Sequence, residues 1–376
     1  MGWLREFDDI RPYTDSELPR VLRRIRRNRW LISGIRRMRV PDCPKILRPF
    51  AHAVIRLDLW IRLRRYNSID DFQRTVVVDR VLHYIVRKTS RGLTWSGTER
   101  LGRGKAYLFI SNHRDIVLDS ALLNYALAKS DLDIAEIAFG DNLLSNEFVS
   151  DLIRINKSFI VYRNLPLRAK AKAAIRLSKY IYMTRSHGNS VWIAQREGRA
   201  KDGKDSTNPS ILKMVYHEAR KEGMDFESFV DWLPIIPVAV SYEFDPCDRF
   251  KSRELSRTRE NGTYNKRKSE DLISIYAGLK GDKGRIHIAF GEPLNKVADI
   301  KSAAAAIDRQ IAELYRLWPS NFVAYDNRQG KSDYNDRYSP SEEQVFLERF
   351  RKETLSVKSI AYEIYSAPVE NQLKAE

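Results

Sequence analysis

The sequence lacks the residues that commonly cross-link a small domain or build a metal site. Its 376 residues include only two cysteines, Cys43 and Cys247, which lie far apart and form no CxxC motif. No secretory signal pattern opens the chain, so we expect a reducing cytosol. The six histidines stand singly, without the spacing of zinc ligands, and we therefore expect no metal.

Long apolar runs are also missing. A membrane-spanning helix needs roughly 18–20 apolar residues. The most apolar N-terminal stretch, residues 50–65, is interrupted by Arg56, Asp58 and Arg62. We therefore expect no transmembrane helix.

The sequence does have a concentrated positive charge. The formal net charge is +17, and residues 20–65 carry most of it, with fourteen arginines and one lysine against two aspartates. Within residues 19–38, one side of the expected helix carries Val21, Leu22, Ile25 and Ile32. A basic amphipathic helix with Trp30 beside it is typical of a segment that lies on anionic lipid, where each cation contributes about 1 kcal/mol.

Two other interpretations of this charge stay open. A basic helix can also bind the phosphates of nucleic acid, but the rest of the sequence has no recognised nucleic-acid motif or aromatic stacking pattern. We therefore expect no nucleic-acid partner. A run of charges is also common on a helix that is simply solvated.

The order of the expected elements indicates an α/β fold. The chain is expected to be helical up to about Thr98, and short β-rich runs then alternate with helical stretches. Such alternation predicts a central, mostly parallel or mixed sheet flanked by helices. We divide the chain into a basic, helical, membrane-apposed region (1–92), a catalytic α/β domain (93–320) and a C-terminal helical tail (321–376).

Finer details of this organisation are also predicted. Helices are expected near Leu18–Met38 and Ala51–Tyr66 and over residues 70–88. The charged stretch Arg249–Asp271 is expected to be an exposed insertion. In the tail, Ser341 followed three positions later by Gln344 predicts a capping box at the start of a helix.

The most informative stretch is residues 106–123, where an expected strand leads into Asn112 and His113 and a helix then carries Asp119. Ligands bind at the carboxyl ends of strands in open α/β sheets. A histidine there can take the proton from a substrate hydroxyl as it attacks an acyl carbonyl, and a carboxylate can hold the imidazole in the required tautomer. No G-x-S-x-G elbow indicates a covalent acyl-enzyme.

Further motifs follow in a specific order. SNHRDIVLD, FIVYR, REGRAKDGK and LPIIPVAV each lie near the end of an expected strand. Together they resemble the four blocks of the glycerol-phosphate and lysophosphatidate acyltransferase family, over about Leu93–Trp318. The resemblance implies that His113 is the general base and that acyl-CoA or acyl-carrier protein donates the acyl group, with no further cofactor. It also implies that the acyl acceptor is bound by Arg163, Glu197, Gly198 and Arg199. Asn112 and Lys204 are further candidates for substrate binding.

The sequence departs from the family pattern beside the histidine. Leu118 occupies the acid position of the family's His-x4-Asp block, and Asp119 comes one residue later. Asp115 stays open as an alternative partner of His113. Either spacing requires a turn between the histidine and the helix that follows.

The second departure is in the block Glu197-Gly198-Arg199, which lacks the threonine of the family's Glu-Gly-Thr-Arg. Arg196, Lys201 and Lys204 therefore stay open beside Arg199 as the cation that binds phosphate. We favour Arg199, since a guanidinium fork suits a phosphate better than an ammonium does.

We therefore expect an acyltransferase of phospholipid synthesis that moves a fatty acyl group onto the hydroxyl of lysophosphatidate or glycerol 3-phosphate. We expect it to act on the cytoplasmic side of a membrane, as a peripheral protein. One alternative is an acyltransferase for a non-phosphate lipid acceptor. Another is a basic protein that binds membranes or nucleic acid and whose catalytic block has decayed.

Overall fold

The computed structural model describes residues 2–144, 146–264 and 270–375. The chain forms two compact units, which are described separately. The smaller unit comprises residues 1–80 and 136–173, and the larger unit comprises residues 81–135 and 174–376. The functional division at residues 92 and 320 stays a prediction.

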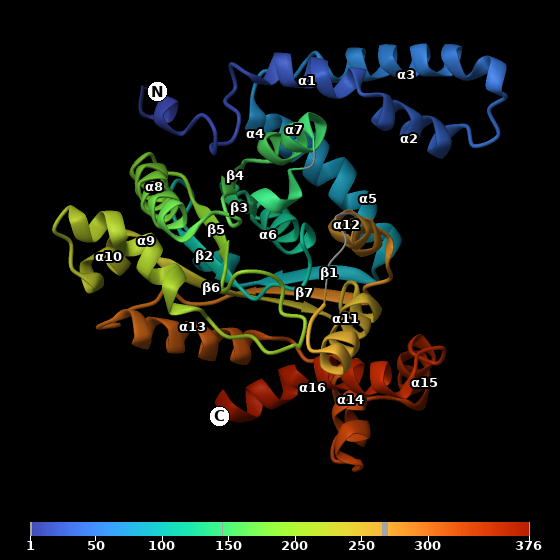
Figure 1. The fold of residues 1–376 in the computed structure, drawn as a ribbon, viewed down its shortest axis with the longest axis vertical. Helices are drawn as coiled ribbons and strands as arrows, with labels where there is room; N and C mark the ends of the chain where they lie inside the picture. The colour runs from blue at the N-terminus through green and yellow to red at the C-terminus, as the bar shows by residue number, and fades with distance from the viewer. Residues whose placement is uncertain (1, 145, 265–269, 376) are drawn as a thin grey trace. The chain divides into compact units, whose positions relative to one another are not determined.

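A mixed β-sheet forms the centre of the larger unit (Figure 1). Its strands, in the order β1-β7-β6-β2-β5, are β1 (Gly92–Ser96), β7 (Arg285–Phe290), β6 (Ile235–Tyr242), β2 (Leu108–Ser111) and β5 (Val191–Ala194). β7 runs antiparallel to β6, and the other neighbours are parallel. Both β2 and β6 are buried along their whole length, as expected for apolar runs in the middle of a covered sheet. The predicted α/β fold with a mixed sheet is confirmed.

Helices cover both faces of this sheet (Figure 1). Those of the larger unit are α5 (His83–Thr89), α6 (Leu118–Lys129), α9 (Pro209–Lys221), α10 (Phe226–Trp232), α11 (Asp248–Asn261), α12 (Glu270–Lys280), α13 (Ile300–Leu314), α14 (Pro319–Gln329), α15 (Pro340–Arg349) and α16 (Leu355–Ala375), and α8 (Leu167–Ser186) begins in the smaller unit. α13 packs against β6, whereas α6 lies on the opposite face.

Strand β1 corrects the expectation of helices up to about Thr98. It is an edge strand that pairs in parallel with β7, and its residues alternate between exposed and half-buried. A short strand that buries only part of one face has a weak apolar pattern, which explains why the sequence does not reveal it.

The charged insertion is also less exposed than the sequence suggests. Residues 248–261 form α11, which packs against α16 and buries Lys251 and Ser252. The amine of Lys251 forms an ion pair with Asp245, which is how a lysine can be buried. Residues 265–269 of the predicted insertion lie outside the described residues.

The tail begins its helix α15 two residues earlier than predicted. Ser339, rather than Ser341, is the N-cap, and it forms a capping box with Glu342. The tail also contains α14 and α16, which pack together around the buried rings of Phe346 and Phe350.

The smaller unit is mainly helical. It contains α1 (Leu18–Arg27), α2 (Arg29–Arg39), α3 (Arg48–Leu63), α4 (Ile69–Phe72), α7 (Glu147–Ile155) and the parallel strands β3 (Glu136–Gly140) and β4 (Ser158–Val161). A π-helix, η3 (Gln73–Leu82), follows α4 directly. The helix predicted near Leu18–Met38 is in fact two helices. Asn28 separates them, because its side chain accepts hydrogen bonds from the N–H groups of Trp30 and Leu31 and so starts α2.

The apolar face of α1 is covered by protein. Val21, Leu22 and Ile25 are buried in a cluster that includes Phe72 and Ile155. This face therefore does not lie on lipid, which corrects the role that the sequence suggests for it. No helix among the described residues is both long enough and apolar enough to cross a bilayer.

Candidate active site

The carboxyl end of β2 is tied to both neighbouring strands. Asn112 follows the last residue of β2, and its side chain is fully buried. Its amide nitrogen donates to the carbonyl of Val240 at 3.1 Å, and its amide oxygen accepts from the N–H of Val240 at 2.8 Å. On the other side, the N–H of Gln195 donates to the carbonyl of Ser111 at 2.9 Å. Asn112 is thus placed to fix the loop that carries His113, and its role in substrate binding stays a prediction.

His113 and Asp119 form a hydrogen-bonded pair. Nδ1 of His113 lies 2.8 Å from Oδ2 of Asp119. Residues 114–117 make an irregular turn before α6 starts at Leu118, so Asp119 sits in the first turn of that helix and faces back to the histidine. The predicted turn between histidine and helix is therefore present, and it accommodates the additional residue of the motif.

The carboxylate of Asp119 accepts several other hydrogen bonds. Oδ2 accepts from the N–H groups of Arg114 and Asp115, at 2.6 and 2.9 Å, and Oδ1 accepts from the hydroxyl of Tyr242 at 2.8 Å. Burial alone would raise the pKa of Asp119, but the contacts with His113, the Asp115 N–H and Tyr242 outweigh it and hold the pKa below its ordinary value. The acid is therefore ionised at neutral pH.

An ionised Asp119 determines the tautomer of the imidazole. The proton on His113 stays on Nδ1, facing the carboxylate, and Nε2 is left as the basic nitrogen. The ring of Trp192 packs edge-on against the imidazole, with 5.8 Å between ring centroids. This packing and the hydrogen bond hold the ring in one orientation, as a general base requires.

Asp115, the alternative acid, makes its hydrogen bonds to the main chain of the turn and not to His113. Its Oδ1 accepts from the N–H groups of Val117 and Leu118, at 2.9 and 2.8 Å, so it caps the turn before α6. Its Oδ2 is buried without a hydrogen bond in the described structure. Burial and the charge of Asp119 raise the pKa of Asp115. The structure therefore pairs His113 with Asp119 and not with Asp115.

The loop after β5 runs beside the histidine. The N–H of Ala200 donates to the carbonyl of His113 at 2.8 Å. Gly198 has φ of 79°, a conformation that glycine adopts without strain and that turns the loop between Glu197 and Arg199. Glu197 is exposed and Arg199 is half-buried.

Of the four cations open for phosphate binding, two are already paired. Arg196 donates to Asp202 at 3.1 Å, and the amine of Lys201 forms an ion pair with Glu254. Arg199 and Lys204 have no side-chain hydrogen bond or ion pair within the described ranges. Arg199 is also close enough to Asp115 to offset part of the rise in the pKa of that acid, which places the charge of Arg199 near the turn at residues 114–117.

Arg114 joins the turn and the loop from behind. Its side chain is 1% exposed, and its guanidinium donates to the carbonyl of Gly203 at 3.2 Å and to the carboxylate of Asp205. It also stacks over the ring of Tyr315. Sequence reasoning misses Arg114 and Tyr242 as parts of the site. The only local signal is that Arg114 directly follows the histidine and that Tyr242 ends a buried strand.

Arg163 lies in the smaller unit, two residues after β4. Its N–H donates to Oδ1 of Asp141 at 3.1 Å. Its side chain lies against Gly140, where an added Cβ would come within 2.8 Å of Nε. Its predicted contact with the acceptor stays a prediction. No group of three or more metal-binding side chains occurs among the described residues.

Comparisons with known proteins agree with the motifs. The model of the Acyltransferase family matches residues 92–241. Glycerol-3-phosphate acyltransferases of Pseudomonas paraeruginosa (strain PA7) and Pseudomonas aeruginosa (strain LESB58) are each 25% identical over 245 residues, which is 62% of this chain and 27% of theirs. The chain thus matches about a quarter of the length of these curated relatives.

A solved structure is also similar. The crystal structure of the 1-acyl-sn-glycerophosphate acyltransferase PlsC from Thermotoga maritima aligns with a TM-score of 0.41 and 12% identity, over 70% of this chain and 87% of that one. The match to the family model covers β1, the His113–Asp119 pair, the loop after β5 and most of β6. The match to the Acyltransferase family model over residues 92–241 therefore agrees with the acyltransferase motifs in this part of the sequence.

Proposed function

We propose that the chain is a glycerolipid acyltransferase in which His113 activates the hydroxyl of the acyl acceptor. The observation that carries this proposal is the 2.8 Å hydrogen bond between His113 Nδ1 and the buried, ionised Asp119. It leaves Nε2 as the base, at the carboxyl ends of parallel strands where ligands of α/β sheets bind.

The chemistry needs no covalent enzyme intermediate. Nε2 of His113 takes the proton of the acceptor hydroxyl while the hydroxyl oxygen forms a bond to the thioester carbonyl carbon. The carbon–sulfur bond then breaks, and the imidazolium returns the proton to the departing thiolate. Asp119 stabilises the imidazolium that forms between these steps, which is the role of the acid in such pairs.

The acceptor in this proposal carries a phosphate, as lysophosphatidate and glycerol 3-phosphate do. Arg199 supports it, since its guanidinium lies beside the catalytic turn and has no ion pair to another described side chain. The names of the curated relatives point to glycerol 3-phosphate. Glu197, Gly198 and Lys204 complete the proposed acceptor site, and acyl-CoA or acyl-carrier protein is the proposed donor.

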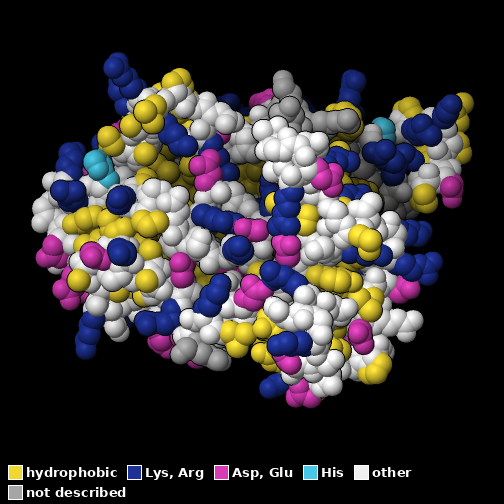
Figure 2. Space-filling model, turned by 60° about the horizontal axis from the view of Figure 1, so that its bottom comes forward, with side chains coloured by type: hydrophobic (Ala, Val, Ile, Leu, Met, Phe, Trp, Pro, Cys, Tyr) yellow, Lys and Arg dark blue, Asp and Glu magenta, His cyan; other side chains and the backbone are white. Residues whose placement is uncertain are grey.

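We also propose that the protein works at the cytoplasmic surface of a membrane, held there by α2 and α3 in place of α1. Large apolar side chains on and between these two helices face solvent, with Trp30 80%, Ile46 86% and Phe50 72% exposed. In Figure 2, dark blue Lys and Arg side chains lie among yellow apolar ones at the upper right, over this helical pair. Apolar side chains among cations are what an anionic lipid surface binds.

The test is acyl transfer with purified protein. Labelled acyl-CoA and acyl-carrier protein are offered with lysophosphatidate, glycerol 3-phosphate and a lipid acceptor without phosphate. We expect transfer to a phosphate-bearing acceptor, and we expect His113→Ala to abolish it without lowering the melting temperature. A His113→Ala variant that keeps most of its activity would refute the mechanism.

The acceptor assignment has a separate test. Arg199→Ala is expected to raise the KM for the phosphate-bearing acceptor by roughly tenfold to a hundredfold, because a charged hydrogen bond contributes about 1.5–3 kcal/mol. The KM for the acyl donor should stay constant. Transfer only to the acceptor without phosphate would refute the assignment of a phosphate-bearing acceptor. It would leave the role of His113 intact.

A further inference from the structure

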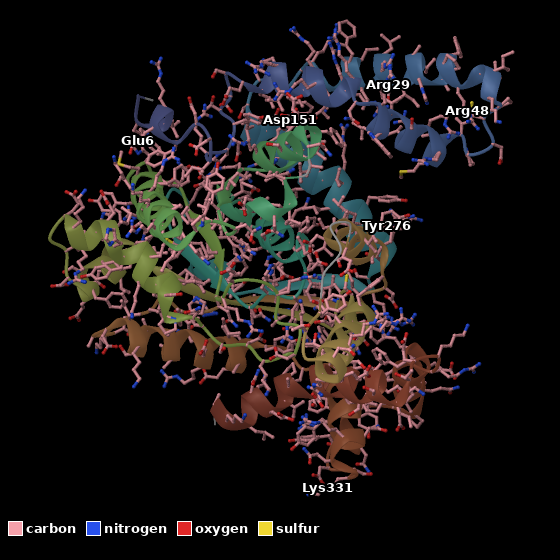
Figure 3. The ribbon with its side chains drawn as sticks, in the orientation of Figure 1. Glu6, Arg29, Arg48, Asp151, Tyr276 and Lys331 are labelled. Carbon is pink, nitrogen blue, oxygen red and sulfur yellow. The ribbon has the colours of Figure 1, made fainter. Side chains whose placement is uncertain are left out.

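A cavity of about 500 Å³ lies between α2 and α3 in the smaller unit. It is lined by Arg29, Ser33, Arg36, Arg37, Arg48 and His52, with Trp30 at its edge. Arg29 and Arg48, which are labelled in Figure 3, come from α2 and α3. We call this cavity the arginine pocket. None of these lining residues lies within residues 92–241, the range that the family model matches.

The base of the arginine pocket holds an incompletely bonded guanidinium. Arg36 is only 7% exposed, and its Nη1 donates weakly to the carbonyls of Val40 and Pro41, at 3.3 and 3.4 Å. Its Nε and the Nε2 of His52 are buried without a partner in the structure as described. A buried donor without an acceptor costs about 1–3 kcal/mol, so this arrangement favours a ligand that supplies acceptor atoms.

The charge of the pocket selects an anion. Among the residues that the structure describes, four arginines line it and no acidic residue does. Asp58, an acid on α3, is already paired with Arg39 and Arg62. Arg29, Arg37 and Arg48 are exposed, so they can close around a ligand from the mouth while Arg36 meets it at the base. Planar guanidinium forks match the oxygens of phosphate in particular.

The apolar surroundings indicate where the phosphate comes from. Trp30 lines the pocket and is 80% exposed, and Ile46 and Phe50, in the segment that leads into α3 and in its first turn, are exposed as well. Apolar side chains beside an anion-binding pocket suit a ligand that stands at the edge of a hydrocarbon layer. A volume of about 500 Å³ is also larger than a free phosphate ion needs and is within the usual range for ligand pockets.

We propose that the arginine pocket binds the phosphate headgroup of an anionic membrane lipid. Only the choice of lipid as the source of the phosphate rests on the membrane placement in the proposed function. The pocket itself follows from the cavity, its four arginines and the unpaired groups of Arg36 and His52. By holding one headgroup, it would orient α2 and α3 on the bilayer in a defined way.

The experiment measures binding to two kinds of vesicle with the same surface charge. In one, phosphatidate is mixed into phosphatidylcholine, and in the other oleate supplies the negative charge. We expect the wild-type protein to bind the phosphatidate vesicles at least tenfold more tightly. In the pocket variant Arg37→Ala/Arg48→Ala, this ratio should fall to about one, because charge-assisted hydrogen bonds to phosphate are lost.

A matched control removes the same charge elsewhere. Arg23 and Arg56 are exposed in the same basic segment but do not line the pocket. Arg23→Ala/Arg56→Ala should weaken binding to both vesicles alike and keep the ratio. Arg36→Lys, which retains the charge at the base but loses the fork, should lower the ratio partly. The His113→Ala variant should keep the full ratio, so failure of catalysis and failure of the pocket give different results.

Three results would overturn the proposal. The first is a pocket variant that keeps the wild-type ratio. The second is tight binding of inorganic phosphate or glycerol 3-phosphate in calorimetry, lost in the pocket variant, with no vesicle preference, since this would assign the pocket to a soluble phosphate. The third is an RNA oligonucleotide that displaces the protein from phosphatidate vesicles at equal phosphate concentration, which would assign the pocket to nucleic acid.

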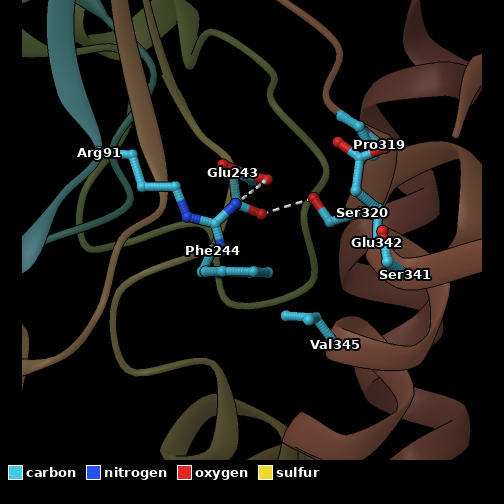
Figure 4. A pocket seen from close by; sticks show the side chains of 8 residues that line it. All are labelled: Arg91, Glu243, Phe244, Pro319, Ser320, Ser341, Glu342 and Val345. Carbon is cyan, nitrogen blue, oxygen red and sulfur yellow. Dashed lines mark hydrogen bonds and ion pairs between the residues drawn. The ribbon is translucent and has the colours of Figure 1, made fainter. Parts of the chain in front are cut away.

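Another cavity, of about 130 Å³, lies in the larger unit beside α14 and α15 (Figure 4). Its polar groups pair with one another. Arg91 lies 3.5 Å from the carboxylate of Glu243, and the hydroxyl of Ser320 donates to the main-chain carbonyl of Glu243. We therefore assign it no ligand.

Discussion

The hydroxyl of Tyr242 donates to Oδ1 of Asp119 at 2.8 Å, on the carboxylate oxygen that His113 does not use. Each oxygen of the acid is thus held by a side chain from a different part of the chain. Burial and the charge of Asp119 raise the pKa of Tyr242 well above its ordinary value, so the phenol keeps the proton that it donates. Tyr242 therefore helps to keep Asp119 ionised.

Tyr242→Phe is expected to shift the pH profile of the proposed acyl transfer. Losing the donor raises the pKa of Asp119, and the acid limb of the kcat profile should move to higher pH. The stability that Asp119 contributes is present above its unfolded pKa of about 3.9 and is lost as pH falls through its lowered folded pKa. Unfolding at neutral pH should cost about 1–3 kcal/mol less in the variant.

The control for this prediction is another buried tyrosine. The hydroxyl of Tyr107 accepts a hydrogen bond from the N–H of Gly102 at 2.8 Å and contacts no catalytic side chain in the described structure. Tyr107→Phe should lower stability by a similar amount but leave the pH profile in place. Equal pH profiles for the two variants would contradict the role given to Tyr242.

Asp119→Asn is expected to lower kcat by a factor on the order of 10³–10⁴, because an amide no longer fixes the tautomer of His113 or stabilises its charged form. Asp115→Asn is the matched control, since both acids are buried within six residues of the histidine. Asp115 can keep its Oδ1 cap as an asparagine, so kcat should change less than tenfold. Steady-state rates and melting temperatures measure both effects.

The stability of the control variant provides a second check. The raised pKa of Asp115 means that its charge destabilises the folded state above the unfolded pKa, and that this cost disappears as the acid is protonated. Asp115→Asn should therefore melt no lower than the wild type at pH 8. Near pH 4 its advantage should vanish. A large loss of kcat in Asp115→Asn, together with normal activity in Asp119→Asn, would mean that Asp115 and not Asp119 is the acid partner of His113.

The sequence predicts the His113–Asp119 pair because both residues lie within one short motif, where local geometry limits the options. Tyr242 cannot be found in this way. It meets Asp119 only after β6 has paired with β2, and pairing between distant strands depends on the whole sheet. The same holds for Arg114, whose partners Gly203 and Asp205 follow another strand.

Helix α1 illustrates a different limit. Periodicity shows that Val21, Leu22 and Ile25 share an apolar face, and this is correct. It does not show what covers that face, because lipid and protein both bury apolar side chains. Here Ile155, far away in the sequence, takes the place that lipid could have taken.

Arg114→Met is expected to raise the KM for the acceptor more than it lowers kcat. Arg114 holds Gly203 and Asp205, at the far end of the loop that carries Arg199. Loss of this contact lets Arg199, the residue proposed to bind the phosphate of the acceptor, move out of position. Arg114→Lys should restore part of the affinity, since an ammonium can still reach one partner. Asp205→Asn should likewise raise the KM for the acceptor more than it lowers kcat. A loss confined to kcat, with KM unchanged in all three variants, would contradict a positioning role.

Among small substitutions in the loop after β5, Gly203→Ala is expected to be one of the most harmful to stability and to acceptor affinity. Gly203 has φ of 75°, and an added Cβ would lie 2.4 Å from the carbonyl oxygen of Ile364 in α16. α16 cannot easily retreat, because the hydroxyl of Tyr365 donates to Asp248 and accepts from the N–H of Asp245, each at 2.8 Å. The loop must therefore move, and both stability and acceptor affinity should fall.

Gly188→Ala separates the clash from the backbone strain. Gly188 has φ of 79°, but an added Cβ there meets nothing within 4 Å. Both variants lose about 1–2 kcal/mol from the left-handed conformation, and Gly203→Ala should lose roughly 1–3 kcal/mol more from overpacking. Urea unfolding measures the difference. Equal losses, with unchanged acceptor KM in both variants, would mean that contact with α16 does not hold the loop in place.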